Sequence, residues 1–206
     1  MRNLWELPRR LSIGGREVEI DPDFRTVLQI FRHFQNEELP EFLRWEVALR
    51  LFYREEIPAQ QRREAMEQLA QFVTCGRPGK PGPRLLDWEH DAMAIVADVN
   101  RVAGREIREL EFVHWWTFLS WFHAIGEGQL SSLVELRRKL ARGEKLDDHQ
   151  RQFYRENKAM VDLPRHRDPG QQAEIDRLNA LLNDPGRVCR GGDSLFAGDQ
   201  KSPLRD

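Results

Sequence analysis

Three residues near the middle of the chain could bind a divalent cation if they shared a helix. Asp87, His90 and Asp91 are spaced at i, i+3 and i+4, which places carboxylate and imidazole groups on one helix face. No ligand from another helix is evident, and Asp87 is also placed to cap the helix that follows it. We therefore interpret Asp87 as a capping residue and predict neither a metal nor a cofactor.

Other residue types that carry chemistry occur without the neighbours they need. His114 and His123 are nine residues apart, so on one ideal helix they point to opposite sides. Cys75 precedes Gly76 and has no histidine close in sequence to activate its thiol. The sequence contains no metalloprotease, nucleophile-elbow or phosphate-loop motif. It therefore predicts no catalytic residues, and we expect a protein that is not an enzyme.

The densest basic run is a candidate contact for nucleic acid. Its members are Arg137, Arg138, Lys139 and Arg142. On a helix Arg138 and Arg142 share one ridge, and Glu135 and Glu144 dilute the local field. The net charge of −2 provides no general attraction for nucleic acid. We interpret the run as a solvated helix face and keep a nucleic-acid-binding regulator as an alternative.

The elements that must position these residues centre on an aromatic segment, residues 111–122, which holds half of the chain's six tryptophans. Its helical stripe is Phe112, Trp115, Phe118, Leu119, Phe122 and Ile125. A helix that is apolar on nearly all sides is normally buried in a core or an interface. Adjacent residues diverge by about 100°, so Trp115 and Trp116 are either both core or divided between core and partner. The candidate partner-binding residues are Trp115, Trp116, Trp121 and Trp88.

The N-terminal residues predict a β-hairpin. A two-residue turn at residues 14–15, both glycine, favours the primed turns that join two antiparallel strands. Its register pairs Ile13 with Arg16 and Leu11 with Val18. One face of the hairpin is then apolar: Leu11, Ile13, Val18 and Ile20. An isolated hairpin is marginal in water, so we expect this face to lie on helices.

Helical periodicity over the remaining chain predicts about seven helices. Their approximate ranges are 24–34, 40–52, 58–75, 88–103, 111–125, 130–142 and 147–163. In the second helix the side chains expected to face inward are Phe42, Trp45, Leu49 and Phe52. Residues 76–84 are rich in Pro and Gly and predict an exposed loop. The expected fold is thus a mainly α helical bundle with a small N-terminal β-hairpin.

The expected domain organisation is one helical domain over residues 1–163 and a flexible tail over residues 164–206. Within the tail, residues 171–183 could form one short helix. The two cysteines, Cys75 and Cys189, lie far apart, and no secretory leader pattern is evident, so we expect free thiols in a reducing compartment. No apolar run approaches the ~20 residues of a membrane span, so we expect no membrane partner.

The order of these features resembles a small family of phage and prophage proteins encoded among the tail genes, close to the tape-measure gene. Its members are often described as tail assembly chaperones. The matching blocks are LP at 7–8, IGGREV at 13–18, DFRT at 23–26, DWEHDA at 87–92, HWWTF at 114–118 and QFYR at 152–155. The tryptophan pair is the most specific element, and the hairpin signature supports it independently.

The resemblance implies a protein that acts in tail assembly in the cytoplasm of the bacterial host and has no catalytic residues. Its expected partners are the tape-measure protein, the tail-tube protein or further copies of itself. The main alternative is a minor structural tail or connector protein that stays in the virion. Finding the protein in purified particles at fixed stoichiometry would favour this alternative.

Overall fold

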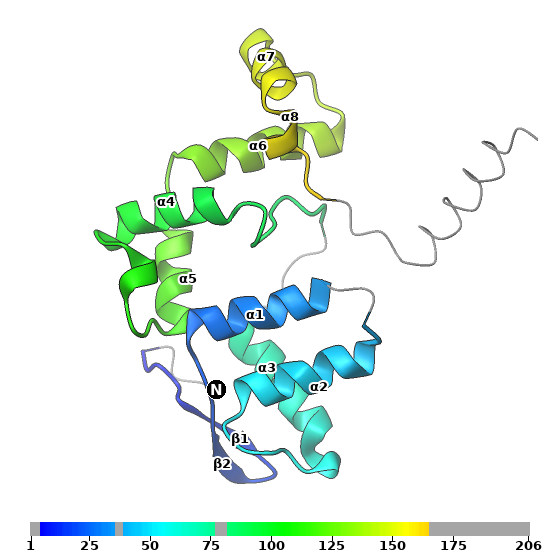
Figure 1. Cartoon of the computed structure of the whole chain (residues 1–206), viewed down its shortest axis with the longest axis vertical. Helices are drawn as coiled ribbons and strands as arrows, with labels where there is room; N and C mark the ends of the chain where they lie inside the picture. The colour runs from blue at the N-terminus through cyan, green and yellow to red at the C-terminus, as the bar shows by residue number, and fades with distance from the viewer. Residues whose placement is uncertain (1–4, 36–38, 77–81, 165–206) are drawn as a thin grey trace, which may run out of the picture. The chain divides into compact units, whose positions relative to one another are not determined.

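The computed structural model describes residues 5–35, 39–76 and 82–164. They form an N-terminal hairpin and eight α-helices (Figure 1), which confirms the predicted mainly α fold. The strands are β1 (Arg10–Ile13) and β2 (Arg16–Glu19), and two short 3-10 helices are η1 (Ala59–Gln61) and η2 (Ile107–Glu109). The α-helices are α1 (Phe24–Gln35), α2 (Glu41–Phe52), α3 (Arg62–Val73), α4 (Ala92–Ala103), α5 (Trp115–His123), α6 (Gln129–Arg142), α7 (Asp148–Glu156) and α8 (Lys158–Val161).

The eighth helix arises because the last predicted helix is divided at Asn157. The side chain of Asn157 donates a hydrogen bond to the carbonyl of Phe153, and α8 begins at the next residue. Residues 165–206 lie outside the described residues, and so does the tail helix proposed at 171–183. Of the proposed loop 76–84, residues 77–81 also lie outside them. The predicted domain boundary after residue 163 stays a prediction.

The hairpin has the predicted register. Ile13 pairs with Arg16 and Leu11 with Val18, and Gly14 and Gly15 both have positive φ, at 58° and 77°. These dihedrals are those of a type I′ turn, which glycine adopts without steric cost. The predicted apolar face, Leu11, Ile13, Val18 and Ile20, is at most 3% exposed. It packs into the same core cluster as the helices, which supplies the support that an isolated hairpin lacks.

Two short backbone pairings hold the start of α1 against the start of α5. The amide of Phe24 donates to the carbonyl of Val113 at 2.9 Å, and the amide of Trp115 donates to the carbonyl of Pro22 at 2.7 Å. The carboxylate of Asp23 also accepts the amide of Val113 at 3.1 Å. Residues about 90 positions apart are therefore joined by main-chain bonds, and this joint fixes where α5 begins.

The aromatic helix is shorter than the sequence predicts. It begins at Trp115 instead of near residue 111, because His114 acts as its N-cap and residues 113–114 are extended against Asp23. Phe112 therefore lies outside the helical stripe, is 41% exposed, and has the guanidinium of Arg9 over its ring.

The start of α4 also differs from the prediction. Asp87 caps a turn rather than the helix itself: one carboxylate oxygen accepts the amides of Glu89 and His90 at 2.9 and 2.7 Å. The helix begins only at Ala92, and Trp88 precedes it. The predicted helix end is correct, since Gly104 follows with φ of 68°, a left-handed conformation suited to glycine.

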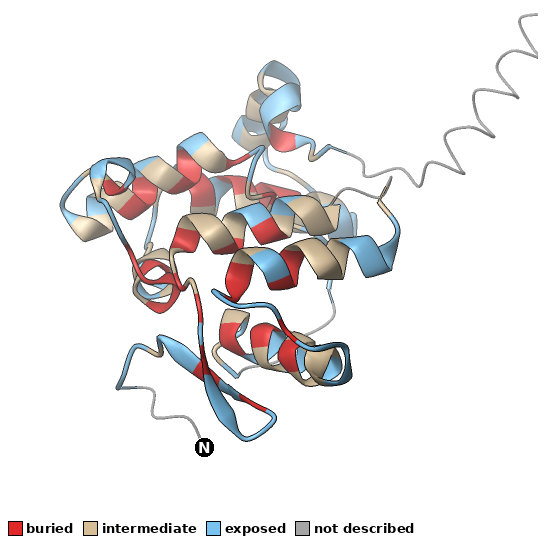
Figure 2. Cartoon of the chain, turned by 60° about the horizontal axis from the view of Figure 1, so that its bottom comes forward, coloured by how far each residue is buried: buried red, intermediate tan, exposed pale blue. Residues whose placement is uncertain are grey.

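The core follows the inward faces of the helices and the hairpin, as the buried residues in Figure 2 show. Phe24 from α1 stacks on Phe118 from α5 with ring centroids 4.7 Å apart. Further along the chain, α6 contacts α4 and α8, and α7 contacts α8. None of the described helices is both long and apolar enough to cross a membrane.

Candidate partner-binding surface

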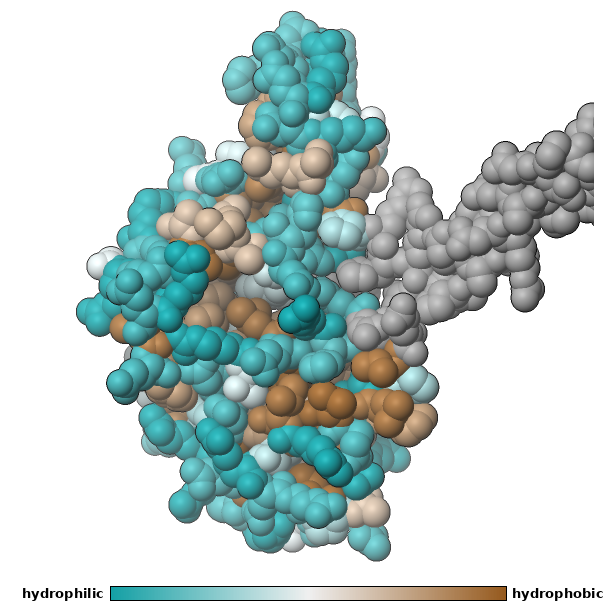
Figure 3. Space-filling view, in the orientation of Figure 1, coloured by the Kyte–Doolittle hydropathy of each residue, from teal (hydrophilic) through white to brown (hydrophobic). Residues whose placement is uncertain are grey.

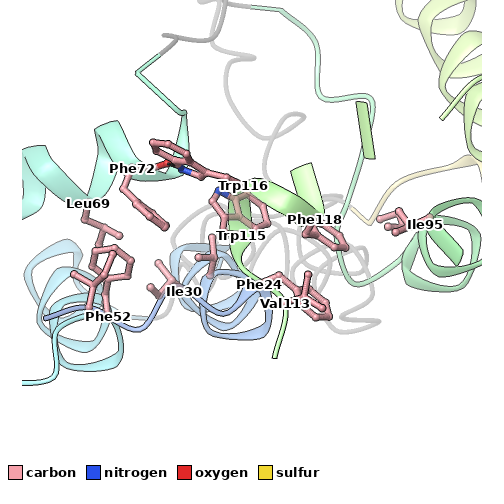
Figure 4. Close-up of a cluster of buried hydrophobic side chains, with 14 of the residues drawn as sticks. Phe24, Ile30, Phe52, Leu69, Phe72, Ile95, Val113, Trp115, Trp116 and Phe118 are labelled. Atoms are coloured by element: carbon pink, nitrogen blue, oxygen red, sulfur yellow. Dashed lines mark hydrogen bonds between the residues drawn. The ribbon is translucent and has the colours of Figure 1, made fainter. Parts of the chain in front are cut away.

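Trp115 and Trp116 both belong to the core. They are 1% and 6% exposed, so the arrangement in which one faces the core and the other a partner is wrong for this structure. Figure 4 shows the two indoles among buried side chains from α1, α2 and α3. Phe31 meets Trp115 edge-on at 5.8 Å, and Phe72 stacks on Trp116 at 5.7 Å. Contact between either indole and a partner would require the core to open.

The two indoles also satisfy the end of α3. The last carbonyls of an α-helix have no partner within the helix. The indole N–H of Trp115 donates to the carbonyl of Val73, and that of Trp116 donates to the carbonyl of Phe72, both at 2.9 Å. The tryptophan pair thus acts as a side-chain cap for α3, and this role explains why buried indoles are suited to these positions.

His114 has a structural role and a defined tautomer. Its Nδ1 accepts the amide of Trp116 at 3.1 Å, so Nε2 carries the proton and donates to the carbonyl of Pro8 at 3.0 Å. Burial lowers the pKa of His114, and the positive charge of Arg9 adds to this, while the bond to Pro8 opposes it. A neutral His114 therefore links the N-terminal segment to α5. His123 is exposed.

The basic run on α6 does not form one solvated surface, contrary to our interpretation. Arg137 is 5% exposed and makes a bidentate ion pair with Asp91 at 2.7 and 2.8 Å. It also donates to three carbonyls, those of Leu85, Met160 and Val161. All five of its N–H groups are therefore used. The remaining members have acidic or amide neighbours: Arg138 with Glu135, Lys139 with Gln150, and Arg142 with Glu144.

Asp87, His90 and Asp91, considered for cation binding, are used in structural hydrogen bonds and ion pairs. The carboxylate of Asp91 accepts Arg137 and the amide of Asp87, and that of Asp87 accepts two amides and pairs with Arg84. The Nε2 atom of His90 meets the carbonyl of Met160 at 3.1 Å. Across the described ranges, no group of three or more His, Cys, Asp or Glu side chains is arranged to hold a metal ion.

Trp88 lies beside an open groove on α1. Its ring stacks on the ring of Phe31, with centroids 5.9 Å apart, and contacts the ring of Phe122, with centroids 5.1 Å apart. One side of the indole is therefore covered by these aromatic rings. The groove has a volume of about 310 Å³, and Leu28 and Ala92 add to its apolar wall. The half-buried Trp121 packs against the core from α5. Partner contact through Trp88 or Trp121 stays a prediction.

The clearest apolar surface lies on α2, where helical spacing did not predict it. Phe42, expected to face inward, is 70% exposed, and Leu43 is 38% exposed. The half-buried Val47 lies one helical turn after Leu43, and the half-buried Leu39 comes just before Pro40, the N-cap of α2. We name Leu39, Phe42, Leu43 and Val47 the α2 patch. Figure 3 shows hydrophobic surface over this helix.

The position of the α2 patch has a physical reason. Trp45 meets Phe34 of α1 edge-on at 4.7 Å, and Arg44 donates to the carbonyl of Phe34. Phe42 lies in the first turn of α2, on the end farthest from the buried residues Ala48, Leu49 and Phe52. One feature of the sequence could have predicted this surface. Leu43 and Val47, at i and i+4, form a second apolar ridge outside the stripe that faces the core.

Comparison with known proteins identifies a family but no individual relative. No curated protein matches the chain, and no solved structure matches it. A family model described as Bacteriophage Gp15 protein matches residues 5–163. This match covers most of the chain, including the hairpin, the tryptophan pair and the α2 patch. The chain therefore belongs to the Bacteriophage Gp15 protein family.

Proposed function

We propose that this chain is a non-enzymatic phage tail assembly factor that binds an apolar segment of the tape-measure protein or the tail-tube protein while the tail forms. Membership of a phage protein family supports a role in phage production. The observation that carries the binding role is the α2 patch, in which Phe42 exposes 70% of its surface beside Leu43.

The patch has the chemistry of a docking site for an amphipathic helix. Such helices place apolar anchors at i, i+3 or i+4, and i+7 into an apolar surface. Burying one aromatic or large aliphatic side chain contributes roughly 1.5–3 kcal/mol. The polar residues around the patch include Glu41 and Arg44, of opposite charge, as in the rim of many protein interfaces. An apolar segment that would otherwise aggregate gains solubility from such a contact.

The buried polar groups support binding over catalysis. Among the described residues, the buried charged or histidine side chains are Asp87, Asp91, Asp98, His114 and Arg137. Each of them makes hydrogen bonds that cap a helix or a turn, or that join two segments. Because these groups already have structural hydrogen-bond partners, we favour a role in which the chain binds a partner through its surface.

Co-expression with the tape-measure protein of the same phage tests the proposal. We expect the soluble fraction of the tape-measure protein to rise when the full chain is present. The variant Phe42→Asp, which places a charge in the α2 patch, should abolish the rise. A tape-measure protein that stays insoluble with or without the chain contradicts the proposal.

Met93→Asp is the matched control. Met93 is 72% exposed on α4, outside the α2 patch, so this variant makes the same kind of surface change at another place. It should retain the solubilising effect. If Met93→Asp and Phe42→Asp lose it equally, the α2 patch is not the docking site.

The alternative role, a structural component retained in the virion, predicts a different result. Purified particles would then contain the chain at a fixed ratio to the tail-tube protein, measurable by quantitative mass spectrometry. An assembly factor of the proposed kind should be absent from finished particles.

A further inference from the structure

Trp88 is partly exposed and lines the open groove on α1, which we name the Trp88 groove. Its apolar wall is formed by Leu28, Trp88 and Ala92, and none of these three residues is buried. The residues that line the groove all lie within the described ranges. A ligand therefore reaches this apolar wall without opening the core.

The indole N–H of Trp88 is a hydrogen-bond donor without an acceptor. Among the described residues it makes no hydrogen bond, whereas Trp115 and Trp116 both donate through their indoles. The buried side-chain nitrogen and oxygen atoms that lack a partner in the described chain are Arg44 Nε and Gln61 Oε1. Because the indole nitrogen of Trp88 is not among them, its N–H reaches solvent and is available to a ligand.

The end of α3 shows what an indole N–H binds in this protein. The carbonyls that accept the indoles of Trp115 and Trp116 belong to Val73 and Phe72, in the last turn of α3. The last carbonyls of any α-helix lack partners within the helix and carry partial negative charge. An available indole N–H beside an apolar groove therefore has the chemistry to bind the end of a further helix.

We propose that the Trp88 groove binds the C-terminal turn of an α-helix from a partner protein. One large apolar side chain of that turn packs against Leu28 and Trp88. The last carbonyls of the helix accept the indole N–H of Trp88 and the guanidinium of Arg32, which lies on the α1 side of the groove. The site shares no residue with the α2 patch and does not depend on the proposed function.

The charges of the groove match this occupant. Arg32 pairs with Glu89 at 3.6 Å, and the two side chains are 73% and 65% exposed, so this surface pair is weak and Arg32 can turn to another acceptor. A positive charge near the C-terminus of a helix is stabilising, because the macrodipole is negative there. Glu89, on the same groove, disfavours a free anion. The match is therefore to the partial charges of carbonyl groups.

The size of the groove favours the end of a helix over its side. One turn of α-helix, 5.4 Å long and 10–12 Å wide, occupies roughly 400–600 Å³. The groove has a volume of about 310 Å³, which is less than one turn. It therefore admits one side chain with the adjoining carbonyls, and not a helix lying lengthwise.

A library of synthetic helical peptides, coupled to beads through the N-terminus and random in the last five residues, tests the proposal with the labelled full chain as the probe. The peptides are amidated, so they carry no terminal charge. Bound peptides should have Leu, Met or Phe in the last turn and no glycine cap, because a glycine-capped helix satisfies its own carbonyls.

The variant Trp88→Phe keeps an aromatic ring and removes the N–H, and it should weaken peptide binding at least tenfold. Trp121→Phe is the matched control: Trp121 is a half-buried tryptophan on α5 outside the groove, so this variant should bind normally. Gln29→Trp, at an exposed position of α1, fills the groove and should also abolish binding. Phe42→Asp, in the α2 patch, should leave binding unchanged.

Nuclear magnetic resonance of the unchanged chain provides a direct measurement. The indole N–H signal of Trp88 is assigned by its loss in Trp88→Phe. It should move downfield when a peptide binds, while the signals of Trp115 and Trp116 keep their positions.

Four results would overturn the proposal. The first is a library in which no peptide binds. The second is peptides that bind Trp88→Phe or Gln29→Trp as well as the unchanged chain, or that leave the Trp88 signal unmoved. The third is loss of binding in Phe42→Asp, which would assign the peptides to the α2 patch. The fourth is a Trp88 signal that moves with chain concentration in the absence of peptide, which would assign the groove to a second copy.

Discussion

Arg137 and Asp91 form a bidentate ion pair in which the two side chains are 5% and 2% exposed. The pair joins α6 to the residue that precedes α4, and the further bonds of Arg137 reach the end of α8 and the segment before Trp88. Four parts of the chain therefore meet at one guanidinium. Removing one member of such a pair leaves an uncompensated buried charge on the other.

The variant Arg137→Met should be strongly destabilising, by about 3–5 kcal/mol, because Asp91 remains buried without its partner. Urea unfolding monitored by tryptophan fluorescence measures the change. Arg138→Met is the control: the side chain of Arg138 is 40% exposed beside Glu135, and such surface pairs contribute about 0–1 kcal/mol. Similar losses in the two variants would argue against the buried pair.

His114 should make the stability of the protein depend on pH. Because burial lowers the pKa of His114 in the folded chain, the unfolded chain, with a value near 6.5, binds the proton more readily. The stability that neutral His114 contributes is therefore complete above pH 6.5 and is lost as the pH falls through the lowered pKa. Urea titrations between pH 5 and 8 measure this loss, whose slope is at most about 1.4 kcal/mol per pH unit.

The variant His114→Asn separates capping from titration. The amide oxygen of asparagine can accept the Trp116 amide, since asparagine is a good N-cap residue, but it does not titrate. We expect the unfolding free energy of the variant to fall less at acid pH than that of the unchanged chain, because position 114 no longer binds a proton. An unchanged pH profile would assign that destabilisation to other groups.

A side chain at position 128 should destabilise the protein. A Cβ atom there would lie 2.5 Å from a carboxylate oxygen of Asp98, whose other oxygen accepts the amide of Leu130 at the start of α6. In Gly128→Ala the carboxylate must move and the cap weakens, at a cost of about 0.5–2 kcal/mol. Gly126→Ala is the control, because a Cβ at Gly126 meets nothing within 4 Å. Thermal unfolding should show a loss only for Gly128→Ala, and equal shifts would contradict the steric argument.

The two indoles should differ in their contribution. Trp115→Phe and Trp116→Phe each keep an aromatic ring and remove one N–H donor. The carbonyl of Phe72 also accepts the amide of Cys75 at 3.1 Å, so it keeps a partner when Trp116 is changed. Among the described residues the carbonyl of Val73 has no other hydrogen-bond donor, so Trp115→Phe leaves this partly buried carbonyl without a described partner, at a cost of about 1–3 kcal/mol. Unfolding free energies should therefore rank Trp115→Phe as the more destabilising change, and the reverse order would count against the capping role.

Local patterns predicted those elements whose ends depend on nearby residues. The hairpin register follows from two glycines and alternating apolar residues, and the ends of α4 and α6 follow from Gly104 and Gly143. The start of α5 was not predictable in this way, because histidine is not a preferred N-cap and the joint with Asp23 spans 90 residues. Likewise, the basic run on α6 indicates a solvated helix face, because the sequence does not reveal that Arg137 pairs with the distant carboxylate of Asp91.

The α2 patch was also not predictable from local spacing. Helical spacing put Phe42 and Trp45 on one stripe, but spacing does not reveal where a neighbouring helix stops covering it. Trp45 is covered by Phe34, and Phe42, less than one turn away, is not. The four tryptophans were chosen for their type, and burial places two of them, Trp115 and Trp116, inside the core.

The bond between Val73 and Trp115 has a consequence for the order in which the protein is made. The two residues are 42 positions apart, so the ribosome finishes α3 well before the indoles that cap it exist. At roughly 5–20 residues per second, the interval is about 2–8 s. During that time the hairpin and the first three helices lack the indole side chains that complete their core, so they expose apolar surface that the finished chain buries.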